Sequence, residues 1–392
     1  MLFTCSPNCR DPRHRHHGVL PVTAASATGR TAARNASSAP GPRGGDEAAA
    51  PAGGPTIDVH CHYLNTAVAA KAAALEPARH DPSTIFASEL TRATNTRQMA
   101  ERAAQLSDIP RRLADMDRMG IDVQVVSPAP FQYYYFADPA KGSALAREVN
   151  EGLQALVGAT PARFAALGTV PLQDCKLAMR ELEYAVTRLG LRGVEIGTNV
   201  NGLNLTDPRL GLERFFALAD ELEAVVFLHP VGFTHAQRLT EHYFNNVIGN
   251  PLDTTVAASH LIFDGFVARF PRVKFLLAHG GGYLAHYWAR MDHAWRARPD
   301  CRAAIDEAPS TFLRRMYFDT VVFDPTLLGR LVEQYGADHV LLGSDYPYDM
   351  GDDDPAGLVA AVAGLPAAQR QLILGGNAAR LFGLPDLART LN

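Results

Sequence analysis

The amino-acid sequence predicts a (β/α)8 TIM barrel with an insertion after its first strand and a disordered N-terminal extension. From residue 56 onward, short apolar runs alternate with segments in which apolar residues recur at intervals of three and four. These two periodicities are typical of buried strands and amphipathic helices. We count eight such runs, and eight parallel strands close a barrel. About 330 residues for eight strand–helix units fit a barrel with insertions better than an open sheet.

Each expected strand is an apolar run that precedes polar or turn-forming residues. The expected strands are 56–61, 123–128, 164–170, 193–198, 225–229, 273–278, 316–321 and 340–344. Helical periodicity is clearest at 145–157, 177–189, 212–222, 254–269 and 326–335. The interval 63–110 is too long for one ordinary connecting helix, so we expect an inserted loop or subdomain over the mouth of the barrel.

Residues 1–54 differ in composition from residues 55–392, which we take as the barrel domain. They contain six arginines, no lysine, three acids and long stretches of Ala, Ser, Gly and Pro. Such a segment buries too little apolar surface to offset its ordering entropy, so we expect it to be disordered. The alternatives are a transit peptide, an overlong start, and a zinc site built from Cys5, Cys9, His14, His16 and His17.

The overall composition excludes several classes of protein. Among the 392 residues, 47% are hydrophobic and 20% are charged, as in soluble globular proteins. The net charge of -4 provides no basic surface for nucleic acid or an anionic membrane. No apolar run approaches the ~20 residues that span a bilayer. Five scattered cysteines are typical of a reducing compartment, so we expect a cytoplasmic protein.

Histidine and aspartate residues follow four of the expected strands. The first strand ends in His60-Cys61-His62, and on an extended strand these two histidines point the same way, because side chains alternate between faces. His229, His279 and Asp345 follow the fifth, sixth and eighth strands. The C-terminal ends of barrel strands meet at one face, where imidazoles and a carboxylate would suit Zn²⁺ or a similar ion. The alternative for any single histidine is a structural residue with satisfied hydrogen bonds.

Five short motifs occur in order along the predicted barrel. They are Ile57-Asp58-Val59-His60-Cys61-His62, Met116-Asp117 with Gly120-Ile121-Asp122-Val123-Gln124-Val125, Leu228-His229-Pro230, Ala278-His279-Gly280-Gly281-Gly282 and Gly343-Ser344-Asp345-Tyr346-Pro347. In this set the chain resembles the amidohydrolase superfamily from Thr56 to about Pro385. Within the superfamily it is most similar to the branch of the aminocarboxymuconate semialdehyde decarboxylase.

The resemblance implies a metal centre of four ligands. His60, His62, His229 and Asp345 would hold one divalent ion, most simply Zn²⁺, with Mn²⁺ as the alternative. His279 would stand beside the ion and exchange a proton with its bound water, a task that suits an imidazole of ordinary pKa about 6.5. Asp345 could also accept a hydrogen bond from that water. The alternative for His279 is a core histidine bonded to a backbone carbonyl.

Two further residues bear on this centre. Arg290 lies eleven residues after His279, the position from which an arginine of the resembled branch reaches a substrate carboxylate, usually from the partner subunit. The resemblance therefore implies a homodimer, while the alternative for Arg290 is a solvated charge on a helix. Glu195, on the fourth strand, is either a further ligand or, as we expect, a buried structural residue. That strand offers no bridging lysine, which favours one ion over two.

The same resemblance leaves the substrate open. The branch has a second arginine at a position that Ala100 occupies in this chain. Arg97 and Arg102 flank that position without matching it. The aromatic run 131–136 is either a wall for a flat substrate or packing against the insertion.

These observations predict a metal-dependent, non-oxidative decarboxylase, a carbon–carbon lyase acting on a small aromatic or conjugated unsaturated carboxylic acid. The alternative is hydrolysis or hydration of a lactone, an amide or an enol acid at the same ion. A non-catalytic barrel protein is a third possibility, because fold does not fix function. We expect no nucleic-acid or membrane partner.

Overall fold

The computed structural model describes residues 54–384 of the chain. The predicted disordered extension, apart from Gly54, and the alternative zinc site in it lie outside the described residues.

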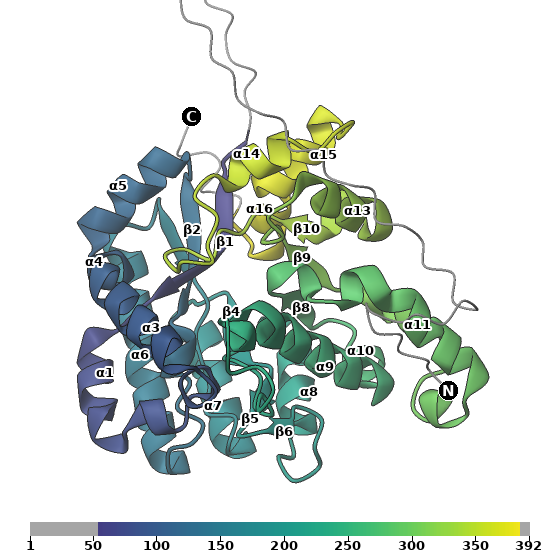
Figure 1. Cartoon of the computed structure of the whole chain (residues 1–392), viewed down its shortest axis with the longest axis horizontal. Helices are drawn as coiled ribbons and strands as arrows, with labels where there is room; N and C mark the ends of the chain where they lie inside the picture. The colour runs from purple at the N-terminus through teal and green to yellow at the C-terminus, as the bar shows by residue number, and fades with distance from the viewer. Residues whose placement is uncertain (1–53, 385–392) are drawn as a thin grey trace, which may run out of the picture. The chain divides into compact units, whose positions relative to one another are not determined.

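Eight parallel strands form the barrel (Figure 1). They are β1 (Ile57–Tyr63), β2 (Val123–Pro128), β3 (Phe164–Ala166), β4 (Gly193–Gly197), β7 (Val225–His229), β8 (Lys274–Leu277), β9 (Tyr317–Asp319) and β10 (Val340–Leu341). Regular pairing gives the orders β1-β2-β3 and β10-β9-β8-β7-β4. Two single bridges, Gly168 with Val194 and Cys61 with Tyr346, join these two sheets at both edges. The predicted eight-stranded barrel is confirmed, and a hairpin of β5 (Asn199–Val200) and β6 (Leu203–Asn204) follows β4.

The regular part of the last strand is shorter than predicted. β10 ends at Leu341 because the next two N–H groups leave the backbone ladder with β9. The N–H of Leu342 donates to the carbonyl of Ile373, and the N–H of Gly343 donates to the hydroxyl of Thr320. The chain nevertheless stays beside β1, since the N–H of Asp345 donates to the carbonyl of His60 at 2.7 Å. Barrel closure therefore continues past the regular ladder and fixes the end of the eighth strand against the end of the first.

Helices cover the outside of the barrel (Figure 1). Four of the five predicted helical segments lie in or largely overlap α6 (Pro139–Ala159), α7 (Cys175–Thr187), α8 (Glu213–Glu221) and α13 (Pro325–Tyr335). The fifth is divided into α9 (Asn250–Phe263) and α10 (Phe266–Arg269), because Gly265 between them has a φ of 76°. The remaining helices after β8 are α11 (Leu284–Ala297), α12 (Pro309–Leu313), α14 (Pro355–Ala360), α15 (Ala367–Gln371) and α16 (Asn377–Leu381). No helix within residues 54–384 has both the length and the apolarity to cross a bilayer.

The insertion after β1 is helical and lies over the mouth of the barrel. It consists of α1 (Thr66–Ala72), α2 (Pro82–Ile85), α3 (Glu89–Glu101) and α4 (Ala103–Ser107), and α5 (Ile109–Met119) then leads into β2. Backbone hydrogen bonding joins Ser88 to Thr240, in the loop after β7, at 2.8 Å. The Arg102 guanidinium donates to the carbonyl of Pro347, in the loop after β10, at 2.7 Å. Both loops follow C-terminal strand ends, so the insertion forms a roof above the predicted active face.

Candidate metal centre and active site

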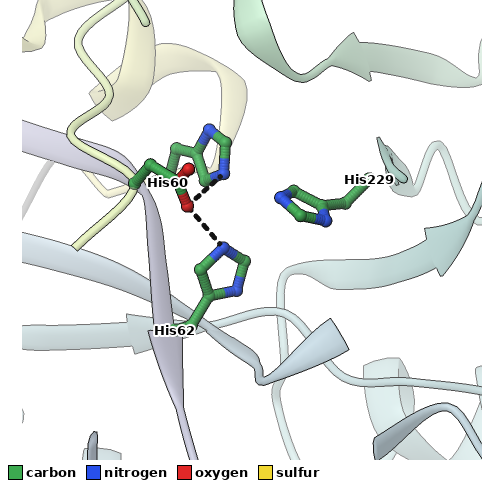
Figure 2. Close-up of side chains that lie close together, drawn as sticks. His60, His62 and His229 are labelled. Carbon is green, nitrogen blue, oxygen red and sulfur yellow. Dashed lines mark ion pairs between the residues drawn. The ribbon is translucent and has the colours of Figure 1, made fainter. Parts of the chain in front are cut away.

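Four buried side chains from three strand ends converge at the mouth of the barrel. One ligand atom from each of His60, His62, His229 and Asp345 lies within 4.8 Å of the corresponding atoms of the others. None of the four residues is more than 5% exposed. Figure 2 shows the rings of the three histidines directed toward one another. The structure thus brings together the four side chains that the sequence predicts as ligands.

The donor atoms of this cluster lack hydrogen-bond partners. Nε2 of His60, Nε2 of His62, both ring nitrogens of His229 and Oδ1 of Asp345 are buried and unpaired. Oδ1 of Asp345 lies 3.3 Å from Nε2 of His60 and 3.2 Å from Nε2 of His62. An unsatisfied buried polar atom costs about 1–3 kcal/mol, so the four that converge, one from each residue, need a common partner. Three imidazoles and a carboxylate suit a divalent metal ion, and the site fits one.

Charge and burial hold two of these groups, His229 and Asp345, in the forms that bind a metal. Burial, together with the nearby rings of His62 and His60, lowers the pKa of His229 well below its usual range, which keeps this imidazole neutral. Burial raises the pKa of Asp345, but the surrounding histidines outweigh it and hold that pKa well below its usual range. Neutral imidazole and ionised carboxylate are the forms that bind a metal ion.

Hydrogen bonds on the far side of two rings fix their orientation. Nδ1 of His60 lies 2.6 Å from Oδ2 of Asp319, and Nδ1 of His62 lies 3.2 Å from the carbonyl of Pro128. An Nδ1 that donates to these acceptors leaves Nε2 of each ring free to face the centre. Asp319 also accepts the backbone N–H groups of His279 at 2.9 Å and Gly280 at 2.8 Å. Its carboxylate therefore links the end of β9 to β1 and to the segment after β8.

A β-bulge directs the two histidines of β1 into the barrel. The pairing of β1 with β2 shifts register between Asp58 and Cys61. Before the shift, Asp58 pairs with Gln124 and binds its side-chain amide at 3.1 Å on the outer side of the sheet. After it, the ring of His60 packs against the inward-pointing Phe227, with centroids 5.1 Å apart. Strict alternation would have kept His60 on the side of Asp58, so the bulge re-aims it, as bulges near active sites often do.

His279 stands beside the four donors without joining them. Its Nε2 lies 3.5 Å from Oδ2 of Asp345, and its Nδ1 has no hydrogen-bond partner. Its side chain is 16% exposed and borders the cavity above the centre. No hydrogen bond from either ring nitrogen to a backbone carbonyl is present within the described chain, in contrast to the alternative of a core histidine.

Glu195 is buried below the centre and is not one of the four converging donors. Oε1 accepts a hydrogen bond from the hydroxyl of Tyr133 at 2.7 Å, and Oε2 lies 3.7 Å from Nδ1 of His62. Burial raises the pKa of this carboxyl group. Burial fits both roles considered for Glu195, so the structural role that we expect stays a prediction.

A cavity of about 460 Å³ lies above the centre. His229, His279 and Asp345 border it, and so do residues of the insertion, of the loop after β7 and of the aromatic run 131–136. The aromatic run thus borders the cavity, and Phe136 also stacks on His80 of the insertion, so the run has features of both roles we considered for it. Arg102 also borders the cavity, whereas Arg290 lies exposed on α11 and does not border the cavity of its own chain.

Sequence reasoning missed two carboxylates that hold this geometry. Asp319 ends the seventh strand, and a carboxylate at a strand end is the signal that identified Asp345. That signal cannot distinguish a metal ligand from a residue that orients a ligand. Asp58 accepts the N–H groups of His60 and Ser344, each at 3.1 Å, and the Ser344 hydroxyl at 2.6 Å. It thereby ties the first strand to the residue before Asp345, a role that the motif containing Asp58 does not indicate.

Comparison with known proteins identifies the family. The family model described as amidohydrolase matches residues 57–384. The chain belongs to the amidohydrolase family. It is 34% identical over 274 residues to a 2-amino-3-carboxymuconate-6-semialdehyde decarboxylase of Dictyostelium discoideum, an alignment that covers 70% of this chain and 76% of the relative. It is 30% identical over 300 residues to a 6-methylsalicylic acid decarboxylase of Penicillium expansum, covering 74% and 84% of the two chains.

Solved structures share the fold. The crystal structure of a 5-carboxyvanillate decarboxylase from Sphingomonas paucimobilis matches with a TM-score of 0.75 at 27% identity and covers 84% of this chain and 99% of its own. A dihydroxybenzoic acid decarboxylase from Polaromonas, solved with bound manganese and the inhibitor 2-nitroresorcinol, matches with a TM-score of 0.72 at 24% identity. It covers 84% of this chain and 97% of its own, and it supports the amidohydrolase barrel as the fold. The predicted relation to the semialdehyde decarboxylase branch is confirmed.

Proposed function

We propose that this amidohydrolase is a metal-dependent, non-oxidative decarboxylase of an aromatic or conjugated unsaturated carboxylic acid. The observation that carries the proposal is the cluster of four unpaired donors that borders a large cavity, with His279 beside it. The named activities of the relatives at 34% and 30% identity, both decarboxylations, support it.

In this proposal His60, His62, His229 and Asp345 hold one divalent ion. Three imidazoles and one carboxylate suit Zn²⁺, and Mn²⁺ is the alternative. When bound, such an ion acts as a Lewis acid that orients substrate oxygen atoms and stabilises the negative charge that develops on them. Asp319 and the carbonyl of Pro128 keep Nε2 of His60 and His62 directed at the ion.

His279 supplies the proton of the reaction. Its exposed edge faces the cavity, so a carboxylic acid held above the donors presents its reacting carbon to this imidazole. A proton passes to the carbon that bears the carboxylate. The bond to the carboxylate carbon then breaks, its electron pair returns to the conjugated system, and CO₂ leaves. The net change replaces CO₂ by a proton and needs no oxidant, reductant or water.

We further propose that the protein is a cytoplasmic homodimer in which Arg290 serves the neighbouring subunit. Arg290 is exposed on α11, the same helix that carries the exposed aromatic side chain of Tyr287. A guanidinium suits bidentate binding of a carboxylate. The scattered cysteines, of which Cys61, Cys175 and Cys301 are free, favour a reducing compartment.

Product analysis tests the proposed reaction. Protein loaded with Zn²⁺ or with Mn²⁺ is incubated with ortho-hydroxybenzoic and muconic-type acids, with matched lactones and amides as the control set. We expect CO₂ and the product lacking the carboxyl group in equal amounts, and no hydrolysis of the control set. Formation of a new acid group from a lactone, without CO₂ from any acid, would contradict the proposal and favour the hydrolase.

A further inference from the structure

The cavity is larger than a single-ring acid requires. It measures about 460 Å³, whereas a cavity of about 150 Å³ is enough to bind benzene. The metal-centre residues His229 and Asp345, with His279, form only a small part of its lining. The remaining walls come from the insertion 77–102, the aromatic run after β2 and the loop after β7. Most of the lining therefore comes from segments other than the metal centre and His279.

Part of this outer wall is aromatic. The ring of His80, from the insertion, stacks on the ring of Phe136 with centroids 4.2 Å apart and planes 5° apart. Tyr134 meets Phe136 edge-to-face at 6.2 Å, and Phe86 and Phe131 also border the cavity. The stacked pair joins the insertion to the loop after β2, so this wall is built from two separate segments and presents flat rings to the interior.

Another part of the wall is a polar stripe on helix α3. Thr91, Asn95, Gln98 and Met99 border the cavity, and their spacing places them on one face of the helix. None of the 13 residues of α3 is buried. The inward face of α3 therefore packs against no core. Its amide and thioether groups remain available to a ligand, whereas the Thr91 hydroxyl is bonded to the hydroxyl of Ser88.

Few charged side chains border the cavity. Arg102 is the only lysine or arginine among the described residues that border the cavity, and it binds the carbonyl of Pro347, two residues after Asp345. Asp81 borders the outer part, where its carboxylate accepts from Ser83 and Thr84. The aromatic wall and the α3 stripe thus contain no lysine or arginine, and Arg102, which follows the stripe at helical spacing, is bound to the loop after β10.

We propose that the substrate is an extended aromatic acid, in which the ring that bears the reacting carboxyl group carries a second, uncharged unsaturated group such as another ring. The second group occupies the outer compartment, which we define as the space between His80, Phe86, Phe131, Tyr134 and Phe136 and the α3 stripe of Thr91, Asn95, Gln98 and Met99. This inference rests on the proposed decarboxylase function, but it concerns the shape and charge of the ligand.

Binding of product-like phenols tests the ligand shape without any turnover. The metal-loaded protein is titrated calorimetrically with resorcinol, with 5-phenylresorcinol and with the same biphenyl carrying a carboxylate on its outer ring. Burial of the added phenyl group should lower Kd by about tenfold or more relative to resorcinol. The outer carboxylate should abolish that gain. Equal affinity for resorcinol and phenylresorcinol, or tighter binding of the carboxylated compound, would overturn the proposal.

Two substitutions locate the second group. Met99→Trp adds bulk to the α3 stripe and should remove the phenyl gain while leaving resorcinol affinity unchanged, and Met99→Leu is its matched control. Phe136→Ala removes the stacking partner of His80 and should weaken the binding of phenylresorcinol but not of resorcinol. This second variant provides the test if Met99→Trp does not fold. If both folded variants keep the wild-type preference for phenylresorcinol over resorcinol, the phenyl group binds outside the outer compartment.

Turnover separates this inference from the proposed function. Each phenol has a matched ortho-hydroxy acid, and release of CO₂ is measured for both acids. If the phenyl group improves binding but neither acid releases CO₂, decarboxylation is refuted and the proposed ligand shape stands. If both acids release CO₂ with the same kcat/KM, the decarboxylase function stands and the proposal of an extended substrate is refuted.

Discussion

Replacing Asp319 by asparagine should weaken metal binding without removing any donor. The carboxylate of Asp319 lies 2.6 Å from Nδ1 of His60 and accepts three backbone N–H groups, from His279, Gly280 and Val321. Asparagine keeps the shape but loses the charge and one acceptor oxygen. A hydrogen bond to a charged group contributes about 1.5–3 kcal/mol, and loss of a partner behind a metal-binding histidine typically weakens affinity by about 10–100-fold. That range is about 1.4–2.8 kcal/mol, so the two estimates agree.

The measurement is a competition between the protein and a chromophoric chelator for Zn²⁺ at neutral pH. Asp319→Asn should raise the Kd for the ion by about 10–100-fold. Asp292→Asn is the matched control, because Asp292 is also buried and accepts the N–H and hydroxyl of Ser310 at 2.9 and 2.7 Å, but does not border the cavity. The control should lose thermal stability and keep its metal affinity. An unchanged Kd in Asp319→Asn, or an equal weakening in Asp292→Asn, would refute the orienting role of Asp319.

The other predictions concern the donors, the pH and the second subunit. His279→Ala should keep its metal and lose about 10²–10⁴ in turnover, whereas His229→Ala should lose the ion; a metal-free His279→Ala protein would instead make that residue a ligand. Burial lowers the pKa of His60, but Asp345 and Asp319 outweigh it and hold that pKa well above its usual range. Because only neutral imidazoles bind, metal affinity should already fall as the pH is lowered toward about 6.5, and equilibrium dialysis that finds no such fall would argue against histidine ligands. Arg290→Ala should raise KM and leave the metal content unchanged, and full activity in a stable monomer would show that no partner arginine is needed.

The strands and the donor cluster could be predicted because both follow from rules that act along the chain. Parallel strands buried on both faces appear as continuous apolar runs, so runs such as 225–229 and 193–198 were recognisable, and β7 and β4 lie there. In a closed barrel, every residue that follows a strand reaches the same face. His229 and Asp345 therefore meet although more than a hundred residues separate them.

The features that the sequence did not reveal depend on register and on long-range contacts. Strand alternation predicts that His60 and His62 point the same way, but it cannot say toward which face, since a bulge shifts the choice. The extent of the cavity was equally hidden. It depends on how the insertion meets the loop after β7, where the N–H of Ser88 donates to the carbonyl of Thr240.

The bulge explains why the centre needs both its irregular strand and its buried carboxylates. Turning His60 inward leaves its Nε2 unpaired beside Asp345, a costly arrangement unless an ion occupies the centre. The backbone that makes the turn is held by Asp58, which accepts the N–H of His60 and, through Ser344, fixes the approach of the eighth strand. Since one carboxylate positions both the first and the eighth strand, the spacing between His60 and Asp345 is set by the fold before any metal binds. A centre built this way is preorganised, so the metal affinity of the chain depends on residues that never contact the ion.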